Sequence, residues 1–394
     1  MSNMEYIRMS DYCSSVRDGT HDTPKPTSEG KPLVTSKAIN NNRIDFNQTY
    51  NISLEDFDKI NKRSLVEKWD ILMSMIGTVG RLFLVREEPD YAIKNVALFK
   101  IGDEKKAKWL YYYLSLKEVQ DYFHAIAAGT SQHFIPLNQL RKLKIHNYNE
   151  NSEKIINILS SYDELIENNE KQIKTLEEMA EKLYKEWFVH FRFPGYEKVD
   201  FHEGIPMGWK RARLRDIAKD IGKSFNKDNR DLYSYYVPID CIPNKSMVLS
   251  DYEDVSNAES SLQTFKKNDI LFGAMRPYFH KVLYSPIDGI TRKTCFVINA
   301  KNRSYTEFLY CLLYQKSSVD YATTVSVGST MPYVRWEDFA RMNIVLPDEN
   351  IVKEFANQVD PILKRLQNFF FENEKLKKQR DLLLPRLMSG KLEI

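Results

Sequence analysis

One set of residues has the types and the order that could hydrolyse a phosphodiester bond. Asp90 follows Pro89, and a Glu-x-Lys triplet begins at Glu104 and ends at Lys106. Two carboxylates and a lysine in this order can hold Mg²⁺ and orient an attacking water. The pattern is permissive, and a charged turn between two strands explains the same residues. We favour the turn and keep a self-contained enzyme as the alternative.

No other catalytic or cofactor-binding motif stands out. The sequence has no Gly-rich loop typical of S-adenosylmethionine binding, no N-P-P-Y-type tetrapeptide and no G-x-x-x-x-G-K-[ST] loop. Its 7 histidines show no metal-ligand spacing. Its 4 cysteines form no C-x-x-C pair, which predicts neither a disulfide framework nor a zinc site: Cys13, Cys241, Cys295 and Cys311. We therefore expect no metal and no resident cofactor in this chain.

The bulk composition is that of an ordinary soluble protein. The chain has 394 residues, of which 42% are hydrophobic and 28% charged, and this length allows roughly two or three domains. No apolar run approaches the roughly 20 residues that cross a bilayer, and the start lacks the features of a secretory signal. The net charge of +3 is only weak support for an anionic partner. We expect a cytoplasmic, reduced protein without membrane contact.

Two short loops have residues suited to gripping phosphate groups. "GTSQ" begins at Gly129, and "GSTM" begins at Gly328, 199 positions later. A glycine lets backbone N–H groups approach a phosphate closely, and Ser, Thr and Gln add donors. A plain turn, in which the glycine supplies a positive φ, is an equally good interpretation.

The two loops belong to a duplication that covers the whole chain. At the same offset Asp70–Ile71–Leu72 matches Asp269–Ile270–Leu271, and Tyr122 matches Tyr321. Short apolar runs broken by Gly or Pro predict strands, and "KWLYYYLSLKEVQDYF" has helical spacing. Each copy of about 150 residues is therefore predicted to be a mixed α and β domain with mostly antiparallel strands.

The duplication also argues against the acidic pattern as an active site. Gly289 and Arg303 occupy the positions that match Asp90 and Glu104. A carboxylate pair that one copy lacks is better explained as surface charge.

Each copy is followed by a long segment with an a/d heptad pattern, which predicts a helix of about 35 residues and about 50 Å. So narrow an apolar seam is not stable alone, so we expect the two helices to pair, and the duplication favours an antiparallel pair. The alternative is that each helix packs on its own domain. Asn169, Asn373 and Arg380 occupy seam positions and either set the register or face solvent. The apolar seam residues are Ile166, Ile173, Leu176, Leu183, Trp187, Leu366, Phe369, Leu376, Leu383 and Leu387.

Four stretches make the chain resemble the specificity subunit of Type I restriction–modification systems. They are "RDGTHDTPKP", "GTSQHFI", "EMAEKLYKEWFVHFRFPGYE" and "LLLPRLMSGKLEI". The resemblance implies a non-catalytic subunit that reads a split target in double-stranded DNA, one half-site per domain. It also implies two modification subunits that hold S-adenosylmethionine and methylate adenine, and restriction subunits that can join them. The second copy has "KDIGKSFNKDNRD" where the first has "SSVRDGTHDTPKPTSEG", so the two halves are expected to read different bases.

Candidate DNA-binding residues follow from donor chemistry near the repeated loops. Arg can take guanine O6 and N7 together, and Gln can take adenine N6 and N7, so Arg276 and Gln132 are plausible base readers. For any single basic residue a solvated surface charge is the more common situation. The full set is Lys31, Lys37, Arg81, Thr130, Ser131, Gln132, Lys223, Lys227, Arg276, Tyr278, His280, Lys281, Ser329, Thr330 and Arg335.

The sequence therefore predicts an α+β fold with two mixed α/β target-recognition domains in tandem, each followed by a long helix, and the two helices form an antiparallel coiled coil with a domain at each end. The expected parts are recognition domain 1 at 1–150, a central helical spacer at 151–195, recognition domain 2 at 196–347 and a C-terminal helical spacer at 348–394. Two alternatives remain: a self-contained DNA-modifying or DNA-cleaving enzyme, and a protein-binding scaffold with no role on DNA.

Overall fold

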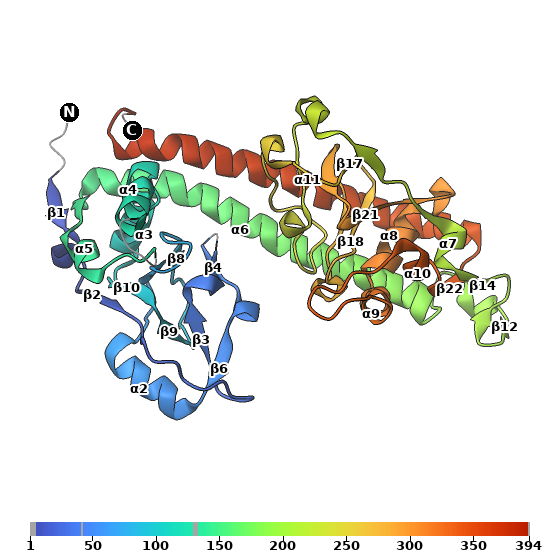
Figure 1. The fold of residues 1–394 in the computed structure, drawn as a ribbon, viewed down its shortest axis with the longest axis horizontal. Helices are drawn as coiled ribbons and strands as arrows, with labels where there is room; N and C mark the ends of the chain where they lie inside the picture. The colour runs from blue at the N-terminus through green and yellow to red at the C-terminus, as the bar shows by residue number, and fades with distance from the viewer. Residues whose placement is uncertain (1–4, 41, 129–132, 393–394) are drawn as a thin grey trace. The chain divides into compact units, whose positions relative to one another are not determined.

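The computed structural model describes residues 5–40, 42–128 and 133–392. The chain divides into two compact units, Met1–Glu164 with Lys377–Ile394 (unit 1) and Leu165–Leu376 (unit 2). Each unit contains one mixed α and β region and part of each long helix, α6 (Glu150–Tyr184) and α11 (Glu349–Met388) (Figure 1). The long helices are therefore part of both units rather than a separate domain.

Unit 1 is built on a four-stranded antiparallel sheet with the order β2-β10-β7-β8. Alternate residues of the central strands enter different cores, as the two-residue period of a strand requires. Ile71 and Phe99 join a core that includes the helices, whereas Leu72 and Leu98 pack against Val34 and its neighbours. Because both faces are covered, these strands are apolar throughout instead of alternating.

A second sheet in unit 1 has the order β6-β3-β9, and in it β3 and β9 are parallel. The main elements of unit 1 are β1 (Tyr6–Arg8), β2 (Ser15–Asp18), β3 (Lys31–Thr35), β6 (Tyr50–Ile52), α2 (Leu54–Ser64), β7 (Ile71–Ser74), β8 (Leu82–Leu84), β9 (Ala92–Lys94), β10 (Val96–Lys100), α3 (Glu104–Leu114), α4 (Lys117–Ala128), α5 (Leu137–Lys142) and β11 (Lys144–His146).

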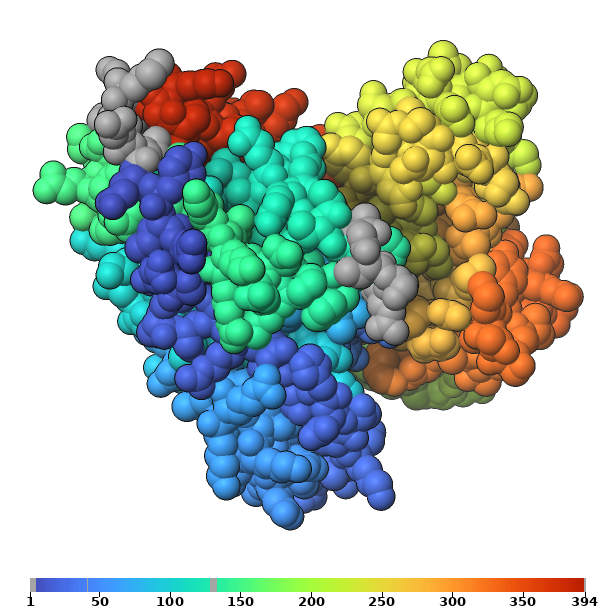
Figure 2. Space-filling model, turned by 60° about the vertical axis from the view of Figure 1, so that its left-hand side comes forward, coloured from blue at the N-terminus to red at the C-terminus, as the bar shows by residue number. Residues whose placement is uncertain are grey.

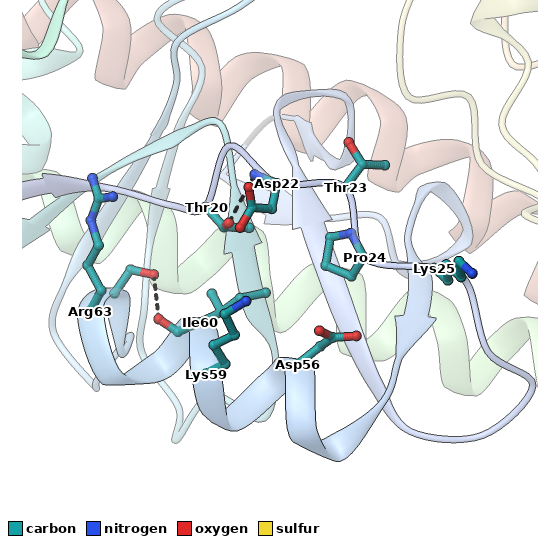
Figure 3. A pocket seen from close by; sticks show the side chains of 10 residues that line it. Thr20, Asp22, Thr23, Pro24, Lys25, Asp56, Lys59, Ile60 and Arg63 are labelled. Carbon is teal, nitrogen blue, oxygen red and sulfur yellow. Dashed lines mark hydrogen bonds between the residues drawn. The ribbon is translucent and has the colours of Figure 1, made fainter.

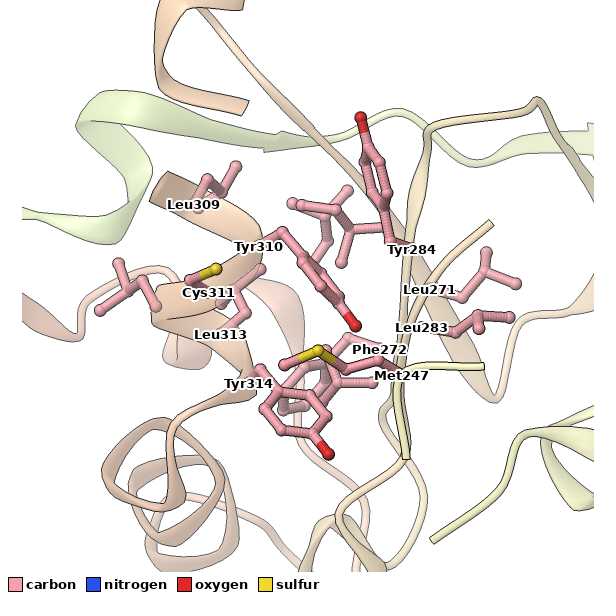
Figure 4. Packing of buried hydrophobic residues seen from close by; sticks show 14 of the residues in the cluster. Met247, Leu271, Phe272, Leu283, Tyr284, Leu309, Tyr310, Cys311, Leu313 and Tyr314 are labelled. Carbon is pink, nitrogen blue, oxygen red and sulfur yellow. The ribbon is translucent and has the colours of Figure 1, made fainter. Parts of the chain in front are cut away.

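Unit 2 repeats the four-stranded sheet, but its three-stranded sheet, with the order β16-β17-β20, is antiparallel throughout. Its four-stranded sheet has the order β15-β21-β18-β19, and its pair β14-β22 corresponds to β1-β11. Aromatic residues of α8 fill the core beside the sheet, with Tyr310 next to Tyr284 and Met247 close to Phe272 (Figure 4). The main elements are β14 (Lys210–Arg213), β15 (Ala218–Asp220), β16 (Lys223–Phe225), β17 (Leu262–Phe265), β18 (Ile270–Gly273), β19 (Val282–Tyr284), β20 (Gly289–Arg292), β21 (Cys295–Ala300), α8 (Thr306–Tyr314), α9 (Lys316–Thr324), α10 (Trp336–Phe339) and β22 (Asn343–Leu346).

A buried aspartate is repeated in the same conformation in both units. Asp70 accepts a hydrogen bond from the Glu67 N–H and lies 2.7 Å from the Lys100 ammonium. Asp269 accepts one from the Lys266 N–H and one, at 2.8 Å, from the amide of Asn299. Burial raises the pKa of both carboxyl groups. The duplication is thus preserved down to a hydrogen-bonded turn in front of β7 and β18.

The offset of 199 between the two copies does not hold at every position, although the sequence comparison used it throughout. Met73 pairs with Leu82, whereas the matching Phe272 pairs with Val282. The connection in unit 2 is therefore one residue longer than its counterpart in unit 1, because strand pairing fixes the residues on either side of it. The offset of 199 returns in the next strand, where Val96 pairs with Ser74 and Cys295 with Gly273.

The long helices pair in an antiparallel direction, as predicted. In unit 1 Arg380 binds Asp163 at 2.6 Å, and in unit 2 the Asn169 amide donates to the Asn373 side chain at 2.8 Å. As α6 advances from Asp163 to Asn169, the partner residue on α11 moves back from Arg380 to Asn373. The polar seam residues therefore face one another and not solvent, and they define the register.

The seam is wider than the predicted a/d stripe. Among the predicted residues Ile166, Ile173, Trp187, Leu366, Phe369 and Leu387 are buried, and Leu176, Leu183, Leu376 and Leu383 are half-buried. Tyr184, Phe188, Leu363 and Phe370 are buried as well, because both helical segments also pack on the core of unit 2. The sequence posed pairing and packing on the domain as alternatives, and both occur. A π-helical turn at Lys185–Val189 changes the phase of α6, so that Trp187 and Phe188 both face inward.

We predict that Arg380→Met destabilises unit 1 by about 3 kcal/mol, the lower end expected for a buried ion pair that loses one partner. Asp163 is only 8% exposed and also accepts a 2.7 Å bond from the Tyr112 hydroxyl, so its charge would remain without a counter-charge. Burial opposes the charge on Arg380, yet the carboxylate of Asp163 raises the pKa of Arg380 above its ordinary value. Urea unfolding followed by circular dichroism measures the change.

The matched control is Lys378→Ala on the exposed face of the same helix, which we expect to change the free energy of unfolding by less than about 0.5 kcal/mol. Replacing the three groups together (Arg380→Met, Asp163→Leu, Tyr112→Phe) should restore much of the loss, because no unpaired polar group remains. Equal stability of the single variant and the wild type would show that the ion pair does not hold the seam.

Candidate nucleic-acid interface

In unit 2 the "GSTM" loop lies next to the turn that carries Arg276, Tyr278 and His280. The turn after β18 contains Arg276 to His280, and the loop after α9 contains Gly328 to Tyr333. Met275 and Tyr333 form a β-bridge, and the Arg276 N–H donates to the Pro332 carbonyl at 2.7 Å. Ser329 and Thr330 on the second loop are exposed. The predicted DNA-binding residues of this copy, apart from Lys223 and Lys227, therefore lie in or next to two adjoining loops.

Unit 1 has the same arrangement. Ile76 and Phe134 form the matching β-bridge, and the Ile135 N–H donates to the Met75 carbonyl at 3.0 Å. Arg81, at the end of the "GTVGR" turn, is half-buried and donates to the Ile39 carbonyl at 3.3 Å. Three more predicted contacts of this copy, Thr130, Ser131 and Gln132, lie outside the described residues.

Two of the predicted contacts in unit 2 use their polar atoms inside the protein. His280 Nε2 lies 2.8 Å from the Tyr314 carbonyl, and the Lys281 ammonium donates to the Ile239 carbonyl at 2.7 Å. Burial lowers the pKa of both side chains. This geometry favours a role in positioning the turn rather than in contacting a base. Sequence reasoning could not see this, because the carbonyl partners belong to remote segments.

Arg276 is a different case. It is half-buried, and its Nε is buried without a hydrogen-bond partner among the described residues. A buried donor without an acceptor is costly. Tyr278, two residues further along the turn, is exposed.

The remaining predicted cations lie at the surface. Lys37, Lys223, Lys227 and Arg335 are exposed, whereas Lys31 is half-buried and pairs with Asp90 at 2.6 Å. Exposed lysines far from a base edge can still meet phosphates, and such contacts fix position without reading sequence.

The nuclease-like pattern does not come together as a metal site. Asp90 pairs with Lys31, and Glu104 pairs with Lys108 at 2.7 Å. The two carboxylates thus have different partners. The triplet Glu104–Lys106 begins helix α3, so it is not the charged turn between strands that we favoured. Across residues 5–40, 42–128 and 133–392 no group of three or more His, Cys, Asp or Glu side chains could hold a metal ion.

A cavity in unit 1 was missed by the sequence reasoning. It measures about 550 Å³ and lies between the segment that follows β2 and helix α2, which adjoin at the surface in Figure 2. Figure 3 shows Asp56, Lys59, Ile60 and Arg63 of α2 on one side and the Thr20 to Lys25 loop on the other. The "RDGTHDTPKP" stretch was a signal for it, since that stretch supplies the loop.

Side chains of the same stretch fix the base of this loop. The buried Asp18 accepts a 2.6 Å bond from Arg63 and lies 2.9 Å from His21 Nε2. His21 Nδ1 in turn lies 2.8 Å from the Asn95 side chain. The base of this loop is therefore held by a polar network that includes Arg63 of α2 and Asn95.

The two repeated α+β units, the paired helices and the adjoining loops define the class of protein. The sequence profile described as "Type I restriction modification DNA specificity domain" matches residues 1–178 and again residues 206–382. The chain belongs to this family, and it is a specificity subunit that recognises a DNA target.

Individual relatives agree with this assignment. The MjaIX specificity subunit of Methanocaldococcus jannaschii is 28% identical over 309 residues, which cover 73% of this chain and 69% of the relative. The HindI specificity subunit of Haemophilus influenzae is 24% identical over 405 residues, covering 84% and 88%. The crystal structure of the S subunit of a Type I system from M. genitalium superposes with a TM-score of 0.54 at 17% identity, covering 98% and 97%, and this supports the fold alone.

No helix in the described ranges is both long enough and apolar enough to span a bilayer. All 4 cysteines are buried and free, so the core contains no disulfide.

The environment of His280 predicts a pH dependence. Burial lowers its pKa below the ordinary 6.5, the carbonyl of Tyr314 opposes this, Lys245 adds to it, and Glu181 and Asp320 oppose it. As the pH falls below about 6.5 the unfolded chain binds a proton that the folded chain still excludes, so stability falls with pH.

We expect His280→Gln to reduce the fall in melting temperature between pH 7.5 and pH 5.5, because glutamine keeps an N–H donor for the Tyr314 carbonyl but binds no proton. His202→Gln, at an exposed position, serves as the control and should leave the pH profile unchanged. Identical profiles for wild type and His280→Gln would mean that this histidine is not the group that titrates.

Proposed function

We propose that this chain reads an asymmetric, bipartite DNA target and scaffolds two adenine-methyltransferase subunits. The observation that carries the proposal is the pair of units whose four-stranded sheets share one strand order but carry different loops at the same place. Arg276 to His280 in unit 2 stands where unit 1 has "GTVGR". A shared scaffold allows two similar docking geometries, while different side chains read different bases.

In this proposal the recognition domains are residues 1–150 and 196–347, and the helical segments 151–195 and 348–394 separate the half-sites. The chain itself is non-catalytic. S-adenosylmethionine is held by the partner subunits, and ATP-dependent restriction subunits can join the complex. Such a complex works in the cytoplasm, where the host DNA is.

We predict that the methylome of the host contains a motif of two different half-sites separated by unspecified bases, and that deletion of this gene removes it. Single-molecule sequencing of host DNA with and without the gene is the measurement. As a control, purified chain alone with DNA, Mg²⁺ and S-adenosylmethionine should neither cut nor methylate. A palindromic motif, or lasting activity of the isolated chain, would contradict the proposal.

A second prediction treats the helix pair as the ruler between half-sites. Inserting one heptad after Glu164 and another after Leu376 lengthens each helix by about 10 Å, or about three base pairs. The spacer of the methylated motif should grow by that amount while both half-sites stay the same.

The matched control inserts four residues at the same two points. Four residues do not complete a heptad, so this variant rotates the seam and should lose specific methylation. An unchanged spacer in a well-folded heptad variant would show that the helices do not set the distance.

A further inference from the structure

The turn between β18 and β19 carries two adjacent aromatic side chains at its tip, and both are exposed to solvent. Tyr278 is 51% exposed and Phe279 39%, and their ring centroids are 4.8 Å apart. Val327 and Met331, on the adjoining loop, are 53% and 52% exposed. Large apolar side chains collected on a loop tip indicate a surface that is covered during function. We call Tyr278 and Phe279 the aromatic tip.

The base of the aromatic tip is fixed from several sides. The Arg276 N–H donates to the Pro332 carbonyl, and the Lys245 N–H donates to the His280 carbonyl at 2.8 Å. The side chains of His280 and Lys281 reach the carbonyls of Tyr314 and Ile239. These partners come from four separate segments, so the two rings project from a rigid support.

The backbone at the tip is held in an unusual conformation. Arg276 and His280, which flank the short turn, have φ values of 50° and 54°. Such values are uncommon for residues other than glycine, and they persist only where the surroundings enforce them. In the matching turn of unit 1 the positive φ values fall on Gly77 and Gly80 instead. Both turns thus contain residues with positive φ. Unit 1 uses glycines there, whereas unit 2 uses larger residues on a connection that is one residue longer.

Charge near the tip indicates which kind of partner covers it. Lys245, hydrogen-bonded to the turn through its backbone, and Arg335, just beyond the adjoining loop, are both exposed cations. A tip of two aromatic rings with cations beside it matches a base step of duplex DNA, where the apolar faces of the bases are flanked by phosphates. A purely apolar protein partner would not need the cations.

We propose that Tyr278 and Phe279 insert against a base step of the half-site that unit 2 reads, and partly unstack it. This inference rests on the proposed function and adds a mode of reading to it. Apolar wedges unstack and kink duplexes in other DNA-binding proteins. Pyrimidine–purine steps unstack most easily, so the tip would select such a step without hydrogen bonds to its bases.

The test uses the full chain assembled with its modification subunits. A duplex carries the target with 2-aminopurine placed in turn at each adenine of either strand of the second half-site, except the adenine that is methylated, because a methyltransferase flips that base out by itself. Fluorescence then reports unstacking. We expect binding to raise the fluorescence at one step. Phe279→Ala and Tyr278→Ala should reduce that rise and weaken binding to the target roughly 10-fold, the loss typical for one aromatic stacking contact.

Two further variants sharpen the comparison. Phe279→Leu retains apolar bulk and should keep most of the fluorescence rise. Phe201→Ala removes an aromatic side chain of the same unit that is 50% exposed but lies in the strand Phe201–His202 and not in the turn. This variant should behave as the wild type.

The outcomes separate this inference from the proposed function. If the wild-type complex binds its target specifically but no position brightens, insertion is wrong and the proposed function stands. If the complex shows no specific binding at all, the proposed function itself fails. A third outcome is that the alanine variants lose their modification subunits on size-exclusion chromatography while the chain itself binds DNA as tightly as the wild-type chain does. In that case the tip binds protein, and the inference is overturned.

Discussion

Everything in this protein depends on the fact that neither long helix can bury its apolar stripe alone. Most of the stability of a helix in a protein comes from the packing of its apolar face, so α6 needs α11. The polar residues then select one register. A shift by one heptad would move Arg380 away from the buried Asp163 and separate Asn169 from Asn373. Leucines alone would tolerate several registers, whereas a buried charge tolerates one.

Because the seam has one register, each recognition domain is held at a defined place on the helices. Ile155, Ile156 and Leu159 of α6 belong to the core of unit 1, and Phe355 and Leu363 of α11 belong to that of unit 2. The domains are therefore fused to the seam by shared side chains rather than attached through flexible linkers.

The sequence predicted the features that local pattern and duplication encode. The repeated run "DIL" correctly predicted a strand at the same place in each copy. The a/d heptads, together with the duplication, correctly predicted the antiparallel helices. It failed where a remote partner decides the role of a residue. Lys281 was predicted to contact DNA, but its ammonium donates to the Ile239 carbonyl. The loop that lines the cavity beside α2 is fixed where Asp18, His21 and Arg63 meet in space. The extra residue before β19 was hidden because the offset returns to 199 in β21.

The division of the helices between the units also determines the order in which the protein can be completed. Leu384, Leu387 and Met388 close the core around Ile156, although 228 positions separate Ile156 from Leu384. At typical translation rates the ribosome needs roughly 10 to 45 s to cross that interval. During this time the apolar face of α6 is already made and its cover is not. A nascent chain therefore carries an open hydrophobic surface through the synthesis of its whole second half, and chaperone binding at this surface would protect it.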